Sequence, residues 1–347
     1  MNIDYVLGSK EDFFRFLETI SLQDKVAILA HNDLDGISST LLLEKILGAK
    51  RIKADYVEFL EIKSDMAKEV LVKLKDNGVT KVIIADLNLE GIDYEGFEEM
   101  RNEMGVFLID HHPIGEKLID KSNIIKAVSQ DCTCLIVFIL GEDLIDSEEW
   151  GWLVCAAIFA DYSFRSEKNL KFLKSFYPEV EPETISSSVP GINARKISSA
   201  LIYYKNDPKY VFSLLKEKNL EEISETHEII EKEVYRAVDD FPKNRKYYPK
   251  KGIYFYEIKS PFDILSYVAT LIGGADPDKT MIFMMKMKNS VRFSARSSNG
   301  GMDMGELMKK GIEGLEDANG GGHVPAAAAQ VKIEDVEIFK KRVLEDD

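Results

Sequence analysis

The sequence predicts an α/β protein with three parts: an N-terminal, mostly parallel, doubly wound sheet, a helical connector, and a smaller α/β C-terminal domain. Short apolar runs alternate with helix-like stretches through the first half, as in sheets built from right-handed β-α-β units. The composition turns polar around residues 182–196, and strand-like runs return after residue 250. At 347 residues the chain is also longer than one ordinary core allows.

The first domain is expected over residues 1–185. Its predicted strands are the apolar runs 26–31, 51–59, 81–87 and 105–110. Apolar residues recur at helical spacing between these runs, which predicts helices at 37–47, 64–77 and 93–103. Further helices are predicted at 133–140, 147–160 and 166–176.

The connector is expected over residues 186–245 and the second domain over residues 246–347. Helices are predicted in the connector at 193–204, 208–218 and 222–240. In the second domain, strands are predicted at 252–258, 280–287 and 291–297. Helices are predicted there at 262–272, 303–312 and 334–345.

Composition indicates a cytoplasmic protein with no membrane partner. No apolar run approaches the ~20 residues that span a bilayer, and the N-terminus carries acids where a signal peptide carries positive charge. Three cysteines do not suggest a disulfide framework. The net charge of −15 argues against a general polyanion binder, but leaves room for nucleic acid held at a local basic patch and a metal site.

Acids and histidines cluster at the ends of the predicted strands. The carboxyl ends of parallel strands meet at one edge of the sheet, where ligands bind. Such acids are often only turn residues or helix N-caps. However, three of the five histidines in the chain also lie at these exits, which favours a shared site. The candidates are His31, Asp33, Asp35, Asp86, Asp110, His111 and His112, with Asp161 after the apolar run 152–160.

A set of imidazoles and carboxylates suits Mn²⁺ or a similar divalent ion better than a thiolate-rich zinc site. The candidates are numerous enough for two ions that share a carboxylate, and such pairs assist displacement at phosphorus. Gly36, just before a predicted helix, also offers backbone N–H groups for an anion.

These residues together resemble the DHH phosphoesterase family. The matching segments of the first domain are "HNDLDG" (31–36), "ADLN" (85–88), "DHHP" (110–113) and "FADYS" (159–163). In the second domain, "FSARSS" (293–298) and "NGGGHVPAAAA" (319–329) resemble the DHH-associated C-terminal domain. The segments occur in the family's order, and the resemblance covers most of the chain.

The resemblance implies two Mn²⁺ ions, with Mg²⁺ or Co²⁺ as substitutes. His31, Asp33 and Asp86 would hold one ion. The other would be held by Asp35, Asp86, His111 and Asp161, so that Asp86 bridges the pair. His112 would contact the scissile phosphate, and Asp110 would orient a neighbouring side chain.

The resemblance also implies that the C-terminal domain grips the rest of the substrate. The residues for this role are Arg296, Ser297, Gly321, Gly322 and His323. Arginine offers a planar fork for phosphate, and glycines let a ligand approach the backbone. The alternative for the glycine run is a flexible turn followed by helix-favouring alanines.

The family includes RecJ-type single-strand exonucleases, nanoRNases that also dephosphorylate 3′-phosphoadenosine 5′-phosphate, and archaeal replisome-associated nucleases. The long bacterial RecJ enzymes add an OB-fold, for which we expect no room after residue 335. The stretch "KNRKYYPKK" (243–251) holds five basic residues and two tyrosines, a combination that suits a single strand. The alternative for this stretch is a solvated lysine-rich loop.

We favour a RecJ-like exonuclease that trims single-stranded DNA or RNA from an end to mononucleotides. Hydrolysis of short oligonucleotides, as in nanoRNases, is the alternative within the same chemistry. A third hypothesis is a replisome scaffold, because some relatives have lost their metal ligands. Here every expected ligand position still holds Asp or His, which argues for activity. A helicase or replisome protein is a candidate partner.

Overall fold

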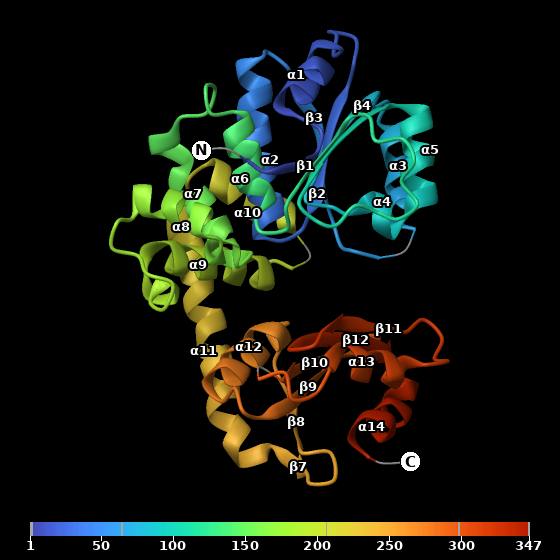
Figure 1. The fold of residues 1–347 in the computed structure, drawn as a ribbon, viewed down its shortest axis with the longest axis vertical. Coiled ribbons are helices and arrows are strands. Elements are labelled where there is room, and N and C mark those ends of the chain that lie inside the picture. The colour runs from blue at the N-terminus through green and yellow to red at the C-terminus, as the bar shows by residue number, and fades with distance from the viewer. Residues whose placement is uncertain (1–2, 64, 206, 298, 346–347) are drawn as a thin grey trace. The chain divides into compact units, whose positions relative to one another are not determined.

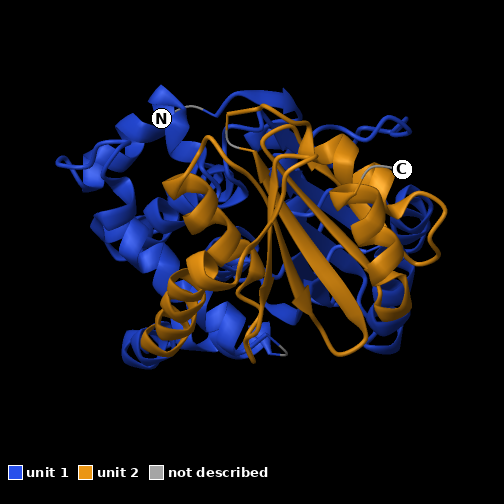
Figure 2. Ribbon diagram, turned by 90° about the horizontal axis from the view of Figure 1, so that it is seen from below, with its two compact units in different colours: residues 1–227 blue, residues 228–347 orange. Residues whose placement is uncertain are grey.

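The computed structural model describes residues 3–63, 65–205, 207–297 and 299–345. Ser64 of the helix predicted at 64–77 and Ser298 of the "FSARSS" segment lie outside these residues. Contacts divide the chain into two compact units, Met1–His227 and Glu228–Asp347 (Figure 2). Among the helices of the described part, none combines the length and apolar character that a bilayer crossing requires.

The first unit contains a six-stranded sheet in the order β1-β6-β5-β4-β2-β3 (Figure 1). The strands are β1 (Tyr5–Leu7), β2 (Val26–His31), β3 (Ala54–Leu60), β4 (Lys81–Ala85), β5 (Gly105–Asp110) and β6 (Ile124–Ala127). Neighbouring strands from β6 to β3 pair in parallel, and only β1 pairs antiparallel, with β6. The predicted mostly parallel sheet is confirmed.

Helices cover both faces of this sheet, so it is doubly wound as predicted (Figure 1). They are α1 (Lys10–Glu18), α2 (Leu34–Ala49), α3 (Met66–Asp76), α4 (Leu89–Ile92), α5 (Tyr94–Glu103), α6 (Thr133–Leu140), α7 (Ser147–Ala160) and α8 (Glu167–Phe176). Short 3₁₀ turns lie at Ser163–Arg165 and Ile185–Ser187. Ile28 and Ala30 of β2 pack with α2, α6 and α7 in one core, whereas Ala27 and Leu29 pack with α3 and α5 in the other. The alternation follows from the two-residue period of a strand.

The segment predicted as a connector forms α9 (Val189–Tyr203), α10 (Pro208–Lys216) and α11 (Leu220–Asn244). Ile197, Val211 and Ile223 from these helices pack in the larger core of the first unit. The division between the two units falls within α11, after His227. The predicted three-part division, with boundaries at 185 and 245, stays a prediction beside this two-unit arrangement.

The second unit contains its own six-stranded sheet, in the order β11-β12-β10-β9-β8-β7 (Figure 1). The strands are β7 (Lys246–Tyr248), β8 (Ile253–Ile258), β9 (Thr280–Lys286), β10 (Ser290–Ser297), β11 (Asn319–His323) and β12 (Ala326–Lys332). Only β8 and β9 pair in parallel. The helices are α12 (Leu265–Ala275), α13 (Met304–Ile312) and α14 (Val336–Leu344), with a 3₁₀ turn at Ile333–Asp335. The predicted smaller α/β domain is confirmed.

One apolar core of the second unit lies under α13 and α14. Phe293 of β10 packs against Phe339 of α14, with ring centroids 4.2 Å apart. Ala327 and Ala329 of β12 are buried in this core, whereas Ala328 faces solvent. The alanine run is therefore a strand with one buried face, and not the helix that alanines favour.

Candidate metal centre

The end of β2 brings the first candidate residues together. His31 is the last residue of the strand, and Asp33 is the N-cap of α2, where its Oδ1 accepts the Gly36 N–H at 3.0 Å. A Cβ on Gly36 would lie 2.2 Å from the His31 carbonyl oxygen, so only glycine fits the close approach of α2 to β2. The Gly36 N–H is therefore occupied by the Asp33 carboxylate, and the expectation that backbone N–H groups at this helix start bind an anion stays a prediction.

Asp35 lies in the first turn of α2 and is buried. Its two carboxylate oxygens accept the N–H groups of Thr133 and Cys134, at 2.7 and 2.8 Å. These are two donors at the N-terminus of α6, which the helix itself cannot satisfy. Asp35 therefore joins α2 to α6, and each of its oxygens keeps a second lone pair for another ligand.

Asp86 follows β4 and stands at the middle of the cluster. Its backbone has φ of 58°, a left-handed conformation that Asp adopts more readily than most residues, and its N–H donates to the Ile109 carbonyl at 3.0 Å. The side chain is buried, and the Thr133 hydroxyl donates to its Oδ1 at 3.3 Å. A fixed backbone and a fixed carboxylate hold this group at the carboxyl edge of the sheet.

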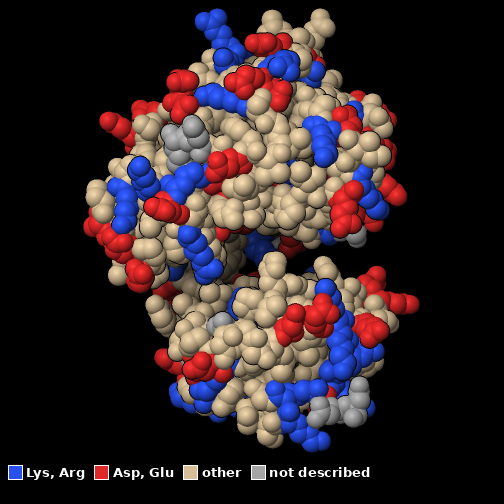
Figure 3. Space-filling model, viewed as in Figure 1, with Lys and Arg blue, Asp and Glu red and all other residues tan. Residues whose placement is uncertain are grey.

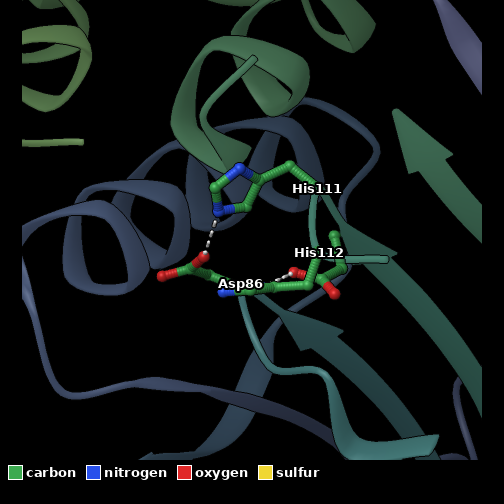
Figure 4. A group of neighbouring side chains, drawn as sticks. Asp86, His111 and His112 are labelled. Atoms are coloured by element: carbon green, nitrogen blue, oxygen red, sulfur yellow. Dashed lines mark hydrogen bonds and ion pairs between the residues drawn. The ribbon is translucent and has the colours of Figure 1, made fainter. Parts of the chain in front are cut away.

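Asp110, His111 and His112 form the exit of β5. The His111 ring points toward Asp86, with Nε2 3.5 Å from Oδ1 (Figure 4). The His112 Nδ1 lies 2.8 Å from Asp110 Oδ1, and the two histidine rings lie 4.5 Å apart. The end of β5 thus directs the His111 imidazole toward the carboxylate of Asp86, while the His112 imidazole is hydrogen-bonded to Asp110.

Asp161 reaches the cluster from the C-terminal end of α7, where it is the C-cap. Its Oδ2 lies 3.6 Å from His111 Nδ1 and accepts the Ser163 hydroxyl at 3.1 Å. On the other side, His31 Nδ1 lies 2.8 Å from Asp33 Oδ2 and 3.8 Å from Asp86 Oδ2. Side chains from the ends of β2, β4 and β5, up to 80 residues apart in sequence, therefore meet that of Asp161 from the end of α7.

Two groups of ligand atoms can each hold an ion. The first consists of His31, Asp33 and Asp86, whose ligand atoms lie within 4.8 Å of one another. The second meets the same limit and consists of Asp86, Asp110, His111 and His112. Asp86 belongs to both, as a bridging ligand must. Asp35 and Asp161, assigned to the second ion by the resemblance, lie in neither group, although Asp161 is near His111.

The electrostatics of the cluster favour a cation. Burial, together with the charges of Asp86 and Asp161, raises the pKa of Asp35 well above its usual range. Burial also raises the pKa of Asp161 to about 6, with a further contribution from Asp86 and against the effect of His111. Burial lowers the pKa of His111, but Asp86, Asp35 and Asp161 outweigh it and raise this pKa to about 10. Asp35, Asp86 and Asp161 thus lie close together without enough positive charge nearby to balance them, and a bound cation would supply it.

The residues present fit divalent metal ions. The buried His111 Nδ1 has no hydrogen-bond partner, and the 3.5–3.8 Å separations that join the histidines to Asp86 and Asp161 are longer than good hydrogen bonds. A buried nitrogen without a partner costs free energy unless something binds it. The donor set of imidazole nitrogens and carboxylate oxygens is the kind that suits Mn²⁺.

Behind the cluster lies a buried ion network that the sequence analysis missed. The Nζ of Lys126, on β6, lies 2.6 Å from Asp110 Oδ2 and 2.6 Å from Glu90 Oε1, and donates to Asn88 Oδ1 at 3.2 Å. All three charged side chains are buried. The signal in the sequence was a single lysine inside the apolar run "IIKAV" (124–128). A lysine there requires buried acids as partners.

This network sets the charges of Asp110 and His112. Burial raises the pKa of Asp110, but His112 and Lys126 outweigh burial and hold it well below its usual range. Burial lowers the pKa of His112, but Asp110 more than offsets this and the pKa lies above its ordinary value. Asp110 is thus a carboxylate at neutral pH, and His112 gains a stronger tendency to carry a proton.

The candidate substrate residues of the second unit lie on β10 and β11. Arg296 pairs with Ala326 of β12, which pairs with His323, so the three residues form one row across three strands. Arg296 Nη1 donates to Ser294 Oγ and to the Ala295 carbonyl, both at 2.9 Å, and Nη2 donates to Thr270 Oγ1 at 3.2 Å.

The remaining candidates of this unit shape the backbone. Gly322 has φ of 142°, and a Cβ there would lie 2.6 Å from the Ala327 Cα, so the position requires glycine. Gly321 precedes it in β11, and a Cβ there would meet only the Cε of Lys309, at 3.9 Å, so this position does not require glycine. Ser297 is fully buried, and its hydroxyl accepts the Met302 N–H at 3.2 Å. Ser297 therefore fixes the backbone at Met302.

Solved structures with this fold include RecJ proteins. RecJ from Thermus thermophilus in complex with Mn²⁺ has a TM-score of 0.71 and 16% identity, over 96% of this chain and 53% of that one. The chain thus spans about half the length of that protein. An exonuclease RecJ bound to manganese has a TM-score of 0.71 and 15% identity, over 99% and 94% of the two chains. CDC45 from Entamoeba histolytica has a TM-score of 0.58 and 10% identity, over 96% and 98%.

At sequence identities of 10–16%, the similarity to these solved structures is one of fold. No curated protein matches the sequence significantly. The family comparison matches residues 25–158 to the N-terminal domain of the DHH family and residues 250–345 to the DHHA1 domain. The first match contains the exits of β2, β4 and β5, and the second contains Arg296 and the glycine strand β11. The chain therefore belongs to the DHH family and carries a DHHA1 domain at its C-terminal end.

Proposed function

We propose that this protein is a cytoplasmic, metal-dependent phosphodiesterase that shortens single-stranded nucleic acid from an end and releases mononucleotides. The observation that carries the proposal is the convergence of imidazoles and carboxylates, all retained, at one edge of the parallel sheet. The RecJ structures of similar fold contain Mn²⁺ or Mg²⁺, which supports the choice of ion.

Two Mn²⁺ ions would be held by this set, with Asp86 shared between them. The proposed ligands are His31, Asp33, Asp35, Asp86, His111 and Asp161. When bound, such ions activate water and stabilise the oxygens of an in-line displacement at phosphorus. The protein's own contribution is to fix these ligands: Thr133 orients Asp86, and the N-terminus of α6 orients Asp35.

His112 is proposed to contact the scissile phosphate. Its Nδ1–H donates to the Asp110 carboxylate, so Nε2 carries a hydrogen and can donate to a phosphate oxygen when the ring is cationic. The raised pKa of His112 favours the cationic ring, and a cationic donor stabilises charge that develops in the transition state. Asp110 and Lys126 keep the ring in this orientation.

The row of Arg296 and His323 is proposed to bind the rest of the substrate. Arginine recognises phosphate through its planar fork, and Gly321 and Gly322 leave the backbone of β11 open to a ligand. Ser297 supports this role by accepting the Met302 N–H, which fixes the backbone there.

A second candidate function is that of a replisome scaffold, which the fold-level similarity to CDC45 favours. A protein that acts only as a scaffold gains nothing from a buried His111 Nδ1 without a hydrogen-bond partner, or from a carboxylate at Asp86 that belongs to both groups of ligand atoms. The complete ligand set therefore supports the enzyme, with association to a helicase or replisome protein as an added role.

The test is a product time course with Mn²⁺ on 20-mers labelled at the 5′ or 3′ end, as DNA and as RNA, beside a labelled dinucleotide. Stepwise shortening of a 20-mer is the expected result, and the label that is released early gives the polarity. Cleavage of the dinucleotide with the 20-mers intact would move the protein to the nanoRNase class. Undiminished hydrolysis in excess chelator would refute the metal-dependent mechanism.

A further inference from the structure

We propose that the β7–β8 hairpin of the second unit carries an accessory binding site for single-stranded nucleic acid, separate from the row of Arg296 and His323. The site consists of Arg245, Lys246, Tyr247, Tyr254 and Lys279, which we call the hairpin site. The inference rests on the proposed function, because its ligand is the proposed substrate.

Charge singles out this hairpin. The segment 243–251 contains five basic residues and no acidic one, in a chain whose net charge is −15. Lys246 and Lys250 are exposed. In Figure 3, Lys and Arg side chains gather at the lower end of the second unit, where Figure 1 shows this hairpin. An acidic protein repels a polyanion over most of its surface, so contacts to a strand must concentrate where the charge is locally positive.

The hairpin also presents a fixed aromatic surface. Tyr247 of β7 stands opposite Tyr254 of β8, with ring centroids 4.7 Å apart and planes inclined by 36°. The guanidinium of Arg245 lies 4.6 Å and the ammonium of Lys279 5.5 Å from the centroid of the Tyr254 ring. Tyr247 remains 53% exposed. A tyrosine held by its neighbours and open to solvent is a platform on which a base can stack.

A cavity of about 450 Å³ adjoins the hairpin and supplies further positive charge. Its cationic lining side chains are Arg236, Lys246, Lys259 and Lys340. The lining also contains two acids: Asp240 accepts the hydroxyl of Tyr256, another lining residue, at 2.8 Å, and Glu257 lies 3.4 Å from Lys286. Two of the cations have acidic partners, Arg236 with Glu233 at 2.8 Å and Lys340 with Glu337 at 2.9 Å, which leaves Lys246 and Lys259 as the main source of positive charge. Lys246 lines this cavity with Phe255, its partner on β8, whereas the next pair, Tyr247 and Tyr254, lies on the opposite face of the hairpin. The cavity therefore offers phosphates a contact on the other face of the same hairpin.

The test measures binding of fluorescein-labelled dT20 and U20 to the full chain by anisotropy, with chelator present to prevent cleavage. Tyr247→Ala is expected to weaken binding about 5- to 150-fold, since stacking of one base contributes ~1–3 kcal/mol. Tyr247→Phe keeps the ring and is expected to bind like the wild type. Tyr235→Ala is the matched control, because Tyr235 is 57% exposed on α11 and does not line the cavity.

Salt dependence tests the charged part of the hairpin site. The double variant Lys246→Gln, Lys250→Gln is expected to reduce the slope of log K against log salt by about 1.4, at about 0.7 per phosphate contact on a single strand. Lys53→Gln, an exposed lysine of the first unit, is the charge control and is expected to leave the slope unchanged. In turnover assays, Tyr247→Ala is expected to raise KM for the 20-mer and leave dinucleotide cleavage unchanged.

The outcomes separate this inference from the proposed function. If the wild type cleaves the 20-mer and Tyr247→Ala binds and cleaves it equally well, the hairpin site is refuted and the proposed function stands. If the wild type neither binds nor cleaves a 20-mer, both fail together. Equal loss of binding in Tyr247→Ala and Tyr235→Ala would also overturn the site, because the effect would not be specific to the hairpin.

Discussion

Replacement of Lys126 by methionine is expected to destabilise the protein by about 3–5 kcal/mol, the usual cost of removing one partner from a buried ion pair. The side chain of Lys126 is 1% exposed, and its ammonium lies 2.6 Å from both Asp110 and Glu90. Methionine has nearly the same length, so packing is largely kept. Two buried carboxylates, however, lose their shared cation and lie in a medium that solvates charge poorly.

The free energy of unfolding is measured by urea denaturation followed by circular dichroism. Lys75→Met is the control, since Lys75 forms an exposed pair with Glu103 at 3.0 Å and such pairs contribute about 0–1 kcal/mol. The double variant Lys126→Met, Glu90→Gln is expected to recover part of the loss, because it removes one of the two charges left without a partner. If Lys126→Met lowers the free energy of unfolding no more than Lys75→Met does, the buried pairs of Lys126 with Asp110 and Glu90 do not stabilise the protein.

Three further predictions concern metal and substrate. Asp86→Asn should lower Mn²⁺-dependent phosphodiester hydrolysis by more than about 100-fold, because loss of a residue that only supports a ligand already costs up to about that much. Asparagine also tolerates the left-handed backbone at this position. A fall of less than about tenfold would contradict a shared ligand. Arg296→Ala should raise KM about tenfold or more with Mn²⁺ content unchanged, and loss of bound metal would contradict its role. Mn²⁺ affinity should fall as pH is lowered from 8.5 to 6.5. Burial lowers the pKa of His31, but Asp33 and Asp86 outweigh burial and raise it to about 10. Protons therefore compete with the metal for this imidazole. Equal Mn²⁺ affinities at both pH values, measured by calorimetry, would refute this linkage.

The first sheet could be predicted because its strands are unambiguous in sequence. The runs that became β2, β4 and β5 are apolar on both faces, as expected for strands covered on both sides. β2 ends in His31, β5 ends in Asp110, and Asp86 directly follows β4. Parallel pairing then brings the exits to one edge, so the candidate metal ligands followed from the pattern.

Other elements could not be predicted because local propensity points elsewhere. Strand β6 has four residues and a lysine in its middle, which only the buried acids Glu90 and Asp110 explain. Strand β12 begins with four alanines, which favour a helix, and it is held as a strand by pairing with β10 and β11. The stretch 243–251 has the composition of a solvated loop, although it includes β7, whose Tyr247 packs against Tyr254 of β8.

The central claim is that one edge of the first sheet holds two divalent ions through a shared Asp86. The most direct measurement is the Mn²⁺ content of the folded protein, determined by mass spectrometry after loading with Mn²⁺ and gel filtration. The proposed function predicts two ions per chain in the wild type, and at least one fewer in Asp86→Asn. A folded wild-type chain that retains one ion or none would contradict the two-metal centre.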